Sequence, residues 1–179
     1  GNYPDSSYRG FCRAAARFVQ VDPECIIPGN GSSELIRLFA EAVLEDGDRA
    51  LIPAPTFGEY ENQSQLAGGR TERLEIGPDG LPRLSHSDLE RAKALFLCNP
   101  NNPTGTMVSA DEVEQLLARV PAHVVVVLDE AYFEYVRSRQ FPDSMAYVKQ
   151  GRNVIVLRTF SKIYGLAGLR IGYGVTTAE

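Results

Sequence analysis

The sequence is poor in the residues that build metal sites and disulfide frameworks. It has only two histidines, His86 and His123, which lie far apart and have no cysteine at ligand spacing. This placement argues against a zinc site. Its three cysteines, Cys12, Cys25 and Cys98, are scattered and odd in number. Such a set fits reduced thiols in a cytoplasm better than paired disulfides, and we expect a cytoplasmic protein without a bound metal.

Long apolar runs and an excess of positive charge are missing too. The longest apolar run, VVVVL at residues 124–128, has the length of a strand and falls far short of the ~20 residues of a membrane helix. The net charge is −5, and no basic patch stands out. These features argue against a membrane and against nucleic acid as the main partner.

What is present is the composition of one globular domain. The 179 residues suffice for a domain with its own core, and 44% apolar with 23% charged residues is ordinary for a soluble protein. The chain opens abruptly on GNYPD and closes on TTAE, directly after the strand-like GYGV. We therefore expect residues 1–179 to form one domain that is incomplete at both ends.

Short apolar runs alternate along the chain with segments of helical periodicity. The runs are continuous, which is typical of strands covered on both faces by helices. The alternation predicts an α/β fold with three layers, α/β/α, and a mostly parallel central sheet. The predicted strands are 25–28, 50–53, 71–74, 94–98, 124–128 and 154–159, and the predicted helices are 9–19, 33–43, 57–66, 87–92 and 109–119.

Polar and glycine-rich segments follow four of the predicted strands. They are GNGSS after 25–28, NPNNPTG after 94–98, DEAY after 124–128 and TFSK at the end of 154–159. In an open parallel sheet, ligands bind beyond the carboxyl ends of the strands. We therefore expect these four segments to form one ligand site.

Lys162 stands in RTFSKIYGLAGLRIGYG, close to the end of a predicted buried strand. Burial and a nearby cation can remove the proton from such a lysine, and the neutral amine can then form a Schiff base with an aldehyde. On its own, Lys162 is explained as well by a surface ion pair. Its neighbours Thr159, Ser161 and Arg170 favour the reactive lysine, because hydroxyl and guanidinium groups suit a phosphate.

Gly31, Ser32 and Ser33 predict the other half of an anion site. Glycine lets the backbone approach a ligand closely, and amides at a helix N-terminus bind anions. An N-capped turn without a ligand would use the same residues. The segment is not a Walker loop, because no Gly-Lys-Ser/Thr follows.

Asp129 ends a run of four valines and a leucine, where a carboxylate is costly unless it meets a cation. A protonated pyridine nitrogen is such a cation, although a helix N-terminus or a basic side chain would also serve. Tyr132 and Asn102 could reach the same ligand, and the Phe57 ring could lie against a flat heteroaromatic or simply pack in the core. Together with a phosphate site and a Schiff-base lysine, these residues describe pyridoxal 5′-phosphate.

With NPNNPTG, DEAYFEY and RTFSKIYGLAGLRIGYG in this order, the chain resembles the fold-type I, class I/II pyridoxal-phosphate aminotransferases over nearly its whole length. YPD, GNGSSELI and RTFSKIYGLAGLR are most similar to the histidinol-phosphate branch of that family. The resemblance implies the cofactor-binding large domain of a homodimer. The N-terminal arm and the small C-terminal domain, which carries the arginine for the substrate α-carboxylate, would be absent.

The resemblance also implies roles for individual residues. Lys162 would hold the cofactor and move a proton, Asp129 would pair with the pyridine nitrogen, and Phe57 would stack on the ring, where the histidinol-phosphate branch more usually has tyrosine. Tyr3 would reach into the site of the other subunit. The phenolic oxygen would be bound by Tyr132 and Asn102, and the phosphate by Ser32, Ser33, Ser161 and Arg170, with Thr159 nearby.

The activity implied is transamination between glutamate and an imidazole-acetol-phosphate-like ketone, in a ping-pong sequence. A threonine-phosphate decarboxylase remains an alternative, because it is similar in the YPD and PTFGEY regions and its substrate also carries a phosphate. A non-catalytic aminotransferase-like sensor domain, of the kind fused to DNA-binding modules, is a second alternative. A dinucleotide-binding domain is a third, and the lack of G-x-G-x-x-G after the first strand argues against it.

Overall fold

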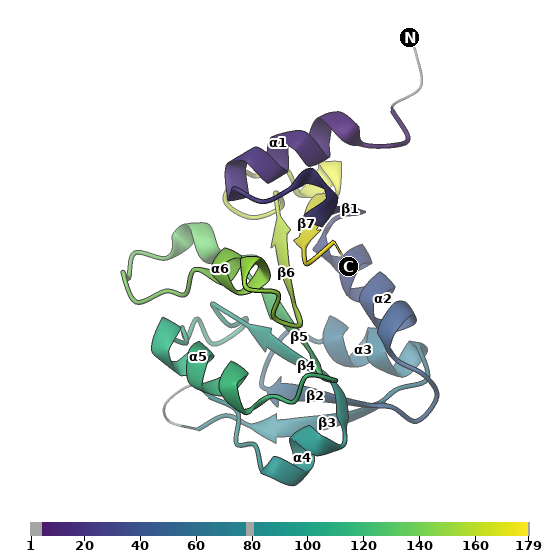
Figure 1. Cartoon of the computed structure of the whole chain (residues 1–179), viewed down its shortest axis with the longest axis vertical. Helices are drawn as coiled ribbons and strands as arrows, with labels where there is room; N and C mark the ends of the chain where they lie inside the picture. Colours follow the sequence, from purple (N-terminus) through teal and green to yellow (C-terminus); the bar gives the residue numbers. More distant parts are fainter. Residues whose placement is uncertain (1–4, 78–80, 179) are drawn as a thin grey trace.

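One seven-stranded sheet forms the middle of the molecule (Figure 1). The computed structural model describes residues 5–77 and 81–178. The strands are β1 Ile26–Asn30, β2 Arg49–Ala54, β3 Arg70–Glu75, β4 Ala92–Cys98, β5 Val125–Asp129, β6 Val154–Thr159 and β7 Ile171–Val175. Across the sheet their order is β1-β7-β6-β5-β4-β2-β3. Only the pairings of β7 with its two neighbours are antiparallel, so the prediction of a mostly parallel sheet is confirmed for the described residues.

Helices cover both faces of this sheet. They are α1 Arg9–Val19, α2 Ser32–Val43, α3 Glu59–Leu66, α4 His86–Glu90, α5 Ala110–Arg119 and α6 Ser144–Lys149, with short 3-10 turns at Pro23–Cys25, Phe133–Tyr135 and Ala167–Leu169. One apolar core lies between the sheet and α1, α4, α5 and α6, and a second lies between the sheet and the pair α2 and α3. Figure 1 shows α5 and α6 on one side of the strands and α2 and α3 on the other. The predicted three-layer α/β/α fold is confirmed.

The continuous apolar run of β5 serves both cores. Val127 packs in the core under α2 and α3, while the residues on either side of it pack in the core under α5 and α6. Successive side chains of a strand point to opposite faces of the sheet. At the end of the strand, Asp129 therefore faces α3 and the next residue, Glu130, faces α6.

Capping boxes begin α4 and α5. The pattern at Ser109 and Glu112 predicts such a box, and the Ser109 hydroxyl indeed accepts a hydrogen bond from the Glu112 N–H. A second box, between Ser85 and Asp88, starts α4 one residue earlier than predicted. The prediction that this helix reaches residue 92 is wrong, because Ala92 already belongs to β4 and pairs with β2.

Two elements carry weak sequence signals. The strand-like GYGV is β7, and its Gly172 is required because a Cβ there would collide with the backbone of Gly31 and Ser32 at the start of α2. The α6 helix has six residues and was not predicted. Both elements are held by packing against β6, which a local pattern does not report.

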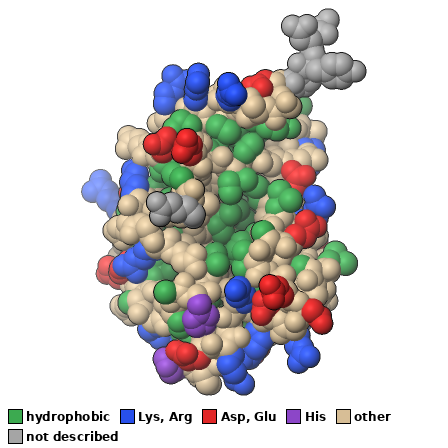
Figure 2. Space-filling model, turned by 45° about the vertical axis from the view of Figure 1, so that its right-hand side comes forward, with side chains coloured by type: hydrophobic (Ala, Val, Ile, Leu, Met, Phe, Trp, Pro, Cys, Tyr) green, Lys and Arg blue, Asp and Glu red, His purple; other side chains and the backbone are tan. Residues whose placement is uncertain are grey.

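Several further features of the described residues bear on the class of protein. None of their helices has the length and apolar character needed to cross a membrane. No three His, Cys, Asp or Glu side chains in this part of the chain lie together as they would around a metal ion. Cys12, Cys25 and Cys98 form no disulfide with one another. On the face drawn in Figure 2, acidic and basic side chains are interspersed around a central hydrophobic area.

Candidate functional site

The residues proposed from the sequence meet beyond the carboxyl ends of β4, β5 and β6. Apart from Gly31 and Tyr3, all of them line one pocket of about 180 Å³. Gly31 directly precedes Ser32, which lines the pocket, and Tyr3 lies outside the described residues. The lining residues among them are Ser32, Ser33, Phe57, Asn102, Asp129, Tyr132, Thr159, Ser161, Lys162 and Arg170.

Asp129 is a buried carboxylate at the floor of the pocket. Its side chain is 3% exposed. The Tyr60 hydroxyl donates to Oδ2 at 2.7 Å, and the Ala131 N–H donates to Oδ1 at 3.1 Å. Burial raises the pKa of Asp129, while these two hydrogen bonds and the charge of Lys162 act in the opposite direction. Both hydrogen-bond donors are neutral, so the negative charge of Asp129 has no hydrogen-bonded cation among the described residues.

Glu130 is equally buried, on the opposite face of the sheet, and it has a counter-charge. Arg158 donates to Glu130 Oε2 from Nε at 3.0 Å and from Nη2 at 2.8 Å, and Ser144 donates to Oε1 at 2.5 Å. The Arg158 guanidinium also lies 3.6 Å from the centroid of the Phe133 ring. Burial raises the pKa of Glu130, and the charge of Arg158 opposes that rise. This pair joins the ends of β5 and β6, which carry Asp129 and the TFSK segment.

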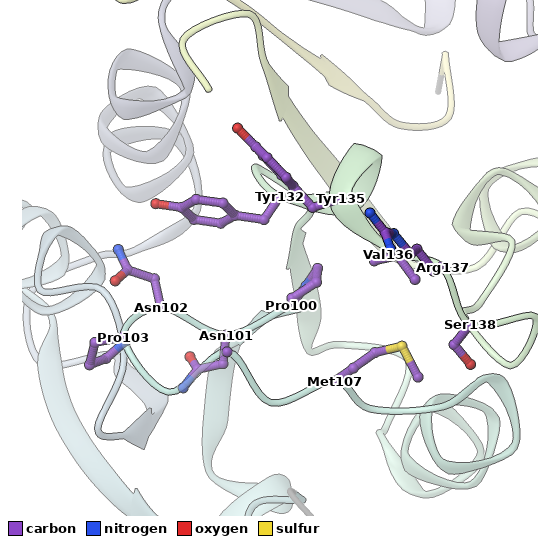
Figure 3. A pocket seen from close by; sticks show the side chains of 11 residues that line it. Pro100, Asn101, Asn102, Pro103, Met107, Tyr132, Tyr135, Val136, Arg137 and Ser138 are labelled. Carbon is purple, nitrogen blue, oxygen red and sulfur yellow. The ribbon is translucent and has the colours of Figure 1, made fainter. Parts of the chain in front are cut away.

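The three asparagines of the NPNNPTG loop make different contacts. Asn99 closes the loop, because its side chain donates to the Val108 carbonyl and accepts from the Val108 N–H, both at 2.9 Å. Asn101 fastens the loop to residues 55–56 through bonds of 2.9 and 2.7 Å. Asn102 is then presented to the pocket, and Figure 3 shows its amide together with the ring of Tyr132.

The start of α2 and Arg170 form another part of the pocket wall. Gly31 caps the helix at φ 79°, and a Cβ at this position would collide with the Arg170 guanidinium. Arg170 itself has left-handed backbone angles, φ 52° and ψ 54°, and donates to the carbonyls of Ala167 and Asn30 at 3.1 and 3.4 Å. The guanidinium is thereby placed beside the free amides of a helix N-terminus, an arrangement that suits an anion. Ser32, Ser33 and Ser161 add hydroxyl groups to the same wall.

Lys162 lies in the loop that follows β6. Its Nζ is 5.2 Å from the centroid of the Tyr132 ring, and the Thr159 hydroxyl accepts from the Ser161 N–H at 3.1 Å just before it. Among the described residues its side chain is exposed. The strand ends at Thr159, three residues before Lys162.

Tyr60 and Cys98 line the pocket although the sequence analysis did not select them. Tyr60 is fully buried, its ring stacked on Phe96 at 4.9 Å and set edge-on to Phe57 at 5.7 Å. The available signal was its spacing, since it follows Phe57 by three residues. The predicted helix over 57–66 in fact begins at Glu59, so Phe57 lies in the turn before it. Burial raises the pKa of the Cys98 thiol to about 11, which keeps it protonated.

The comparison with known families decides what this pocket belongs to. Residues 1–179 match the family of class I and II aminotransferases. The chain belongs to this aminotransferase family. A histidinol-phosphate aminotransferase from Moorella thermoacetica is 45% identical over 180 residues, which cover 99% of this chain and 47% of that protein. The chain spans about half the length of the curated relatives it matches.

Solved structures of related proteins share the fold described above. Histidinol-phosphate aminotransferase from Sinorhizobium meliloti, in complex with pyridoxal-5′-phosphate, has a TM-score of 0.88 and 30% identity, covering 99% of this chain and 49% of that one. L-threonine-O-3-phosphate decarboxylase from Porphyromonas gingivalis has a TM-score of 0.86 and 29% identity, covering 99% and 54%. The predicted likeness to the fold-type I family is therefore confirmed.

Proposed function

We propose that this chain is the cofactor-binding large domain of a pyridoxal-phosphate-dependent histidinol-phosphate aminotransferase. The observation that carries the proposal is Asp129, a buried carboxylate that faces the pocket and has only neutral hydrogen-bond donors. A buried charge without a counter-charge is costly. A protonated pyridine nitrogen in the pocket would add a hydrogen-bonded positive charge to the electrostatic effect of Lys162. The relative with bound cofactor supports the same assignment.

The remaining pocket residues fit the other parts of this cofactor. Phe57 would lie against the ring, and Asn102 and Tyr132 would donate to its phenolic oxygen. The phosphate would be held at the start of α2 by Ser32, Ser33, Ser161 and Arg170. These groups fit because the anion site and the buried carboxylate line one and the same pocket.

Each residue would contribute one step of the chemistry. When bound, pyridoxal phosphate supplies an aldehyde for covalent attachment of an amino group and an electron-withdrawing ring. Lys162 Nζ would hold the cofactor and then carry the proton removed from the substrate α-carbon. Asp129 would keep the ring nitrogen protonated. Tyr132, whose ring lies 5.2 Å from Lys162 Nζ, would help to orient that amine.

The substrate proposed is an amino acid or keto acid pair in which glutamate is the donor and the acceptor is a phosphorylated ketone similar to imidazole acetol phosphate. Support comes from the names of the relatives at 37–45% identity. A second cavity of about 460 Å³ adjoins the pocket, because Asn102 and Tyr132 line both (Figure 3). We place the substrate in this cavity. The same proposal includes a homodimer with Tyr3 in the partner's site, and a cytoplasmic location that suits the free cysteines.

A threonine-phosphate decarboxylase is the second candidate. The observation that favours it is the likeness to the Porphyromonas gingivalis decarboxylase at 29% identity. The relatives with higher identity, 37–45%, are named histidinol-phosphate aminotransferases, which favours the first candidate. The family match argues against a dinucleotide-binding domain. A sensor domain would bind the cofactor and show no turnover.

The cofactor is tested by titrating the full-length protein with pyridoxal phosphate and recording its visible absorbance. We expect a yellow band that Lys162→Ala abolishes, and a borohydride-reduced adduct on the peptide that contains Lys162. The chain has three lysines, so Lys93→Ala and Lys149→Ala, both exposed and outside the pocket, are matched controls that keep the band. An adduct on any lysine other than Lys162, or no band in the folded wild type, would refute the proposed site.

The reaction is tested with two substrates. A transaminase supplied with glutamate and imidazole acetol phosphate forms 2-oxoglutarate, whereas the decarboxylase releases carbon dioxide from threonine phosphate. We expect 2-oxoglutarate and no carbon dioxide. The reverse result would establish the decarboxylase, and cofactor binding without either product would favour the sensor domain.

A further inference from the structure

Tyr60 links α3 to the end of β5 across the floor of the pocket. It is separated from Asp129 by 69 residues, and its hydroxyl donates to Asp129 Oδ2 at 2.7 Å. The side chain is 0% exposed. Burial and the charge of Asp129 raise the pKa of Tyr60 well above its ordinary value of 10.0, so the hydroxyl stays protonated and remains a donor. Asp129 therefore has a permanent neutral partner on one of its two oxygens.

The ring of Tyr60 makes a second connection inside the same pocket. It stacks on Phe96 with centroids 4.9 Å apart and planes 18° apart, which fixes its orientation. Its other contact is edge-on to Phe57, with centroids 5.7 Å apart and planes at 82°. Phe57 is only half-buried, and it stands in the turn before α3. Tyr60 is thus in contact with the carboxylate at the pocket floor and with the aromatic ring at the pocket wall.

We propose that Tyr60 is a positioning residue that holds the Asp129 carboxylate and the Phe57 ring at the two places where the cofactor ring is bound. This inference rests on the proposed function. A carboxylate has about four lone-pair sites. Tyr60 and the Ala131 N–H occupy one on each oxygen of Asp129 and fix its rotation, which leaves the remaining sites for the pyridine N–H. Two hydrogen bonds to the ionised form also help to keep Asp129 charged.

Two ligands that differ only at the pyridine nitrogen of the cofactor can distinguish a positioning role of Tyr60 from a purely structural one. The probes are pyridoxal phosphate and its carbocyclic analogue, in which C–H replaces the ring nitrogen. Dissociation constants of both are measured by absorbance titration of the full-length apoprotein. Only pyridoxal phosphate can use an oriented Asp129 carboxylate, whereas both probes need the phosphate site and Phe57.

For Tyr60→Phe we expect the affinity for pyridoxal phosphate to fall roughly tenfold to a hundredfold, the effect of losing a hydrogen bond to a charged group. Affinity for the carbocyclic analogue should stay within about twofold of wild type. Tyr147→Phe is the matched control, because it removes a buried phenol from α6, outside the pocket. It should change neither constant. The thermal midpoint of each apoprotein checks that it is folded.

Tyr60→Leu tests the connection to Phe57. It should weaken binding of the carbocyclic analogue as well, because the edge contact with the Phe57 ring is lost. If Tyr60→Leu and Tyr60→Phe bind the analogue equally well, Tyr60 does not position Phe57. In an Asp129→Asn background, Tyr60→Phe should change pyridoxal-phosphate affinity by about twofold at most, and this pair tests the proposal even if Tyr60→Phe alone fails to fold.

The other outcomes are equally informative. If Tyr60→Phe weakens both probes to the same extent, or weakens neither, the positioning role is refuted while the proposed function stands. If the folded wild-type protein binds no pyridoxal phosphate at all, the proposed function fails and this inference fails with it.

Discussion

Asp129 and Glu130 are neighbours in the chain and opposites in the fold. Both are carboxylates at the end of β5, both are at most 3% exposed, and burial raises the pKa of both. They face opposite layers of the molecule. Glu130 meets the guanidinium of Arg158, whereas Asp129 meets a phenol and a backbone amide.

The difference between these two residues shows how a structural charge can be told from a functional one. A buried charge that finds its counter-charge within the chain contributes to the fold, and removing one partner leaves the other uncompensated. A buried charge supported only by neutral donors is stabilised incompletely, and it lowers its free energy when a cation binds. Asp129 is of the second kind and lies in a pocket, which is why we propose that it serves ligand binding.

The largest effect on stability is expected from removing the ion pair between Glu130 and Arg158. Arg158→Met should lower the free energy of unfolding by about 3–5 kcal/mol, because it leaves Glu130 buried without a counter-charge. The measurement is urea denaturation of the full-length apoprotein. Arg152→Met is the matched control: Arg152 pairs with Glu114 at the surface, with side chains 31% and 48% exposed, so its loss should cost at most about 1 kcal/mol.

A double variant sharpens this test. Adding Glu130→Gln to Arg158→Met removes the stranded charge and should recover part of the lost stability. No recovery in the double variant would show that packing of Arg158 against Phe133, and not the charge of Glu130, was responsible.

The next largest effect is expected from replacing Asp129, and it should fall on turnover and hardly on stability. Asp129→Asn should lower turnover about 100- to 1000-fold, as expected when a preorganised charge at a reacting group is lost. Unfolding free energy of the apoprotein should change by less than about 1 kcal/mol, because a costly buried charge is removed together with its hydrogen bonds. Steady-state kinetics measures the turnover, and urea denaturation of the same preparation measures the free energy of unfolding. A large loss of stability with little loss of turnover would reverse the two roles.

The smallest effect is a dependence of stability on pH. The pKa of Asp129 is raised above its ordinary value of 3.8 in the folded apoprotein, so the folded chain takes up this proton at a higher pH than the unfolded chain. The cost of burying the charge is therefore present at high pH and relieved as the pH falls through the folded pKa. Wild type should gain stability relative to Asp129→Asn as the pH falls through the folded pKa toward the ordinary value of 3.8, by at most about 1.4 kcal/mol per pH unit.

The comparison with Asp129→Asn isolates this carboxyl from the other groups around it. Glu130 titrates in the same direction and is present in both proteins. Tyr60 and Cys98 also face Asp129, but burial raises the pKa of each, so both stay protonated over this range. Lys162 is the cation that opposes the shift. A stability difference that is flat with pH would mean that Asp129 is not penalised by burial.

Much of the pocket could be predicted because its residues are tied to strand ends. An apolar run identifies a buried strand, and the sheet brings the ends of parallel strands together. Asp129, Asn102 and Lys162 each follow such a run, so their meeting in one pocket followed from the strand pattern. The resemblance of their motifs to the aminotransferases then added the proposed roles.

The errors and omissions have a common physical origin. Tyr60 was missed because its importance lies in a hydrogen bond to a residue 69 positions away. The exposure of Lys162 could not be derived from the sequence, because burial depends on what packs around the loop after β6, and the described residues leave that loop open. The boundaries of α3 and α4 moved because loop contacts and sheet pairing outweighed local periodicity.

The amino-acid sequence by itself determined the order of strands and helices, the polar segments at the strand ends and the kinds of chemical group that meet there. Only the tertiary structure decided which of two adjacent carboxylates meets a cation, that of Glu130 at Arg158, and which has only neutral hydrogen-bond donors, that of Asp129. The physical reason is that desolvation and hydrogen bonding depend on distances in space, and β5 turns successive side chains toward different layers of the fold.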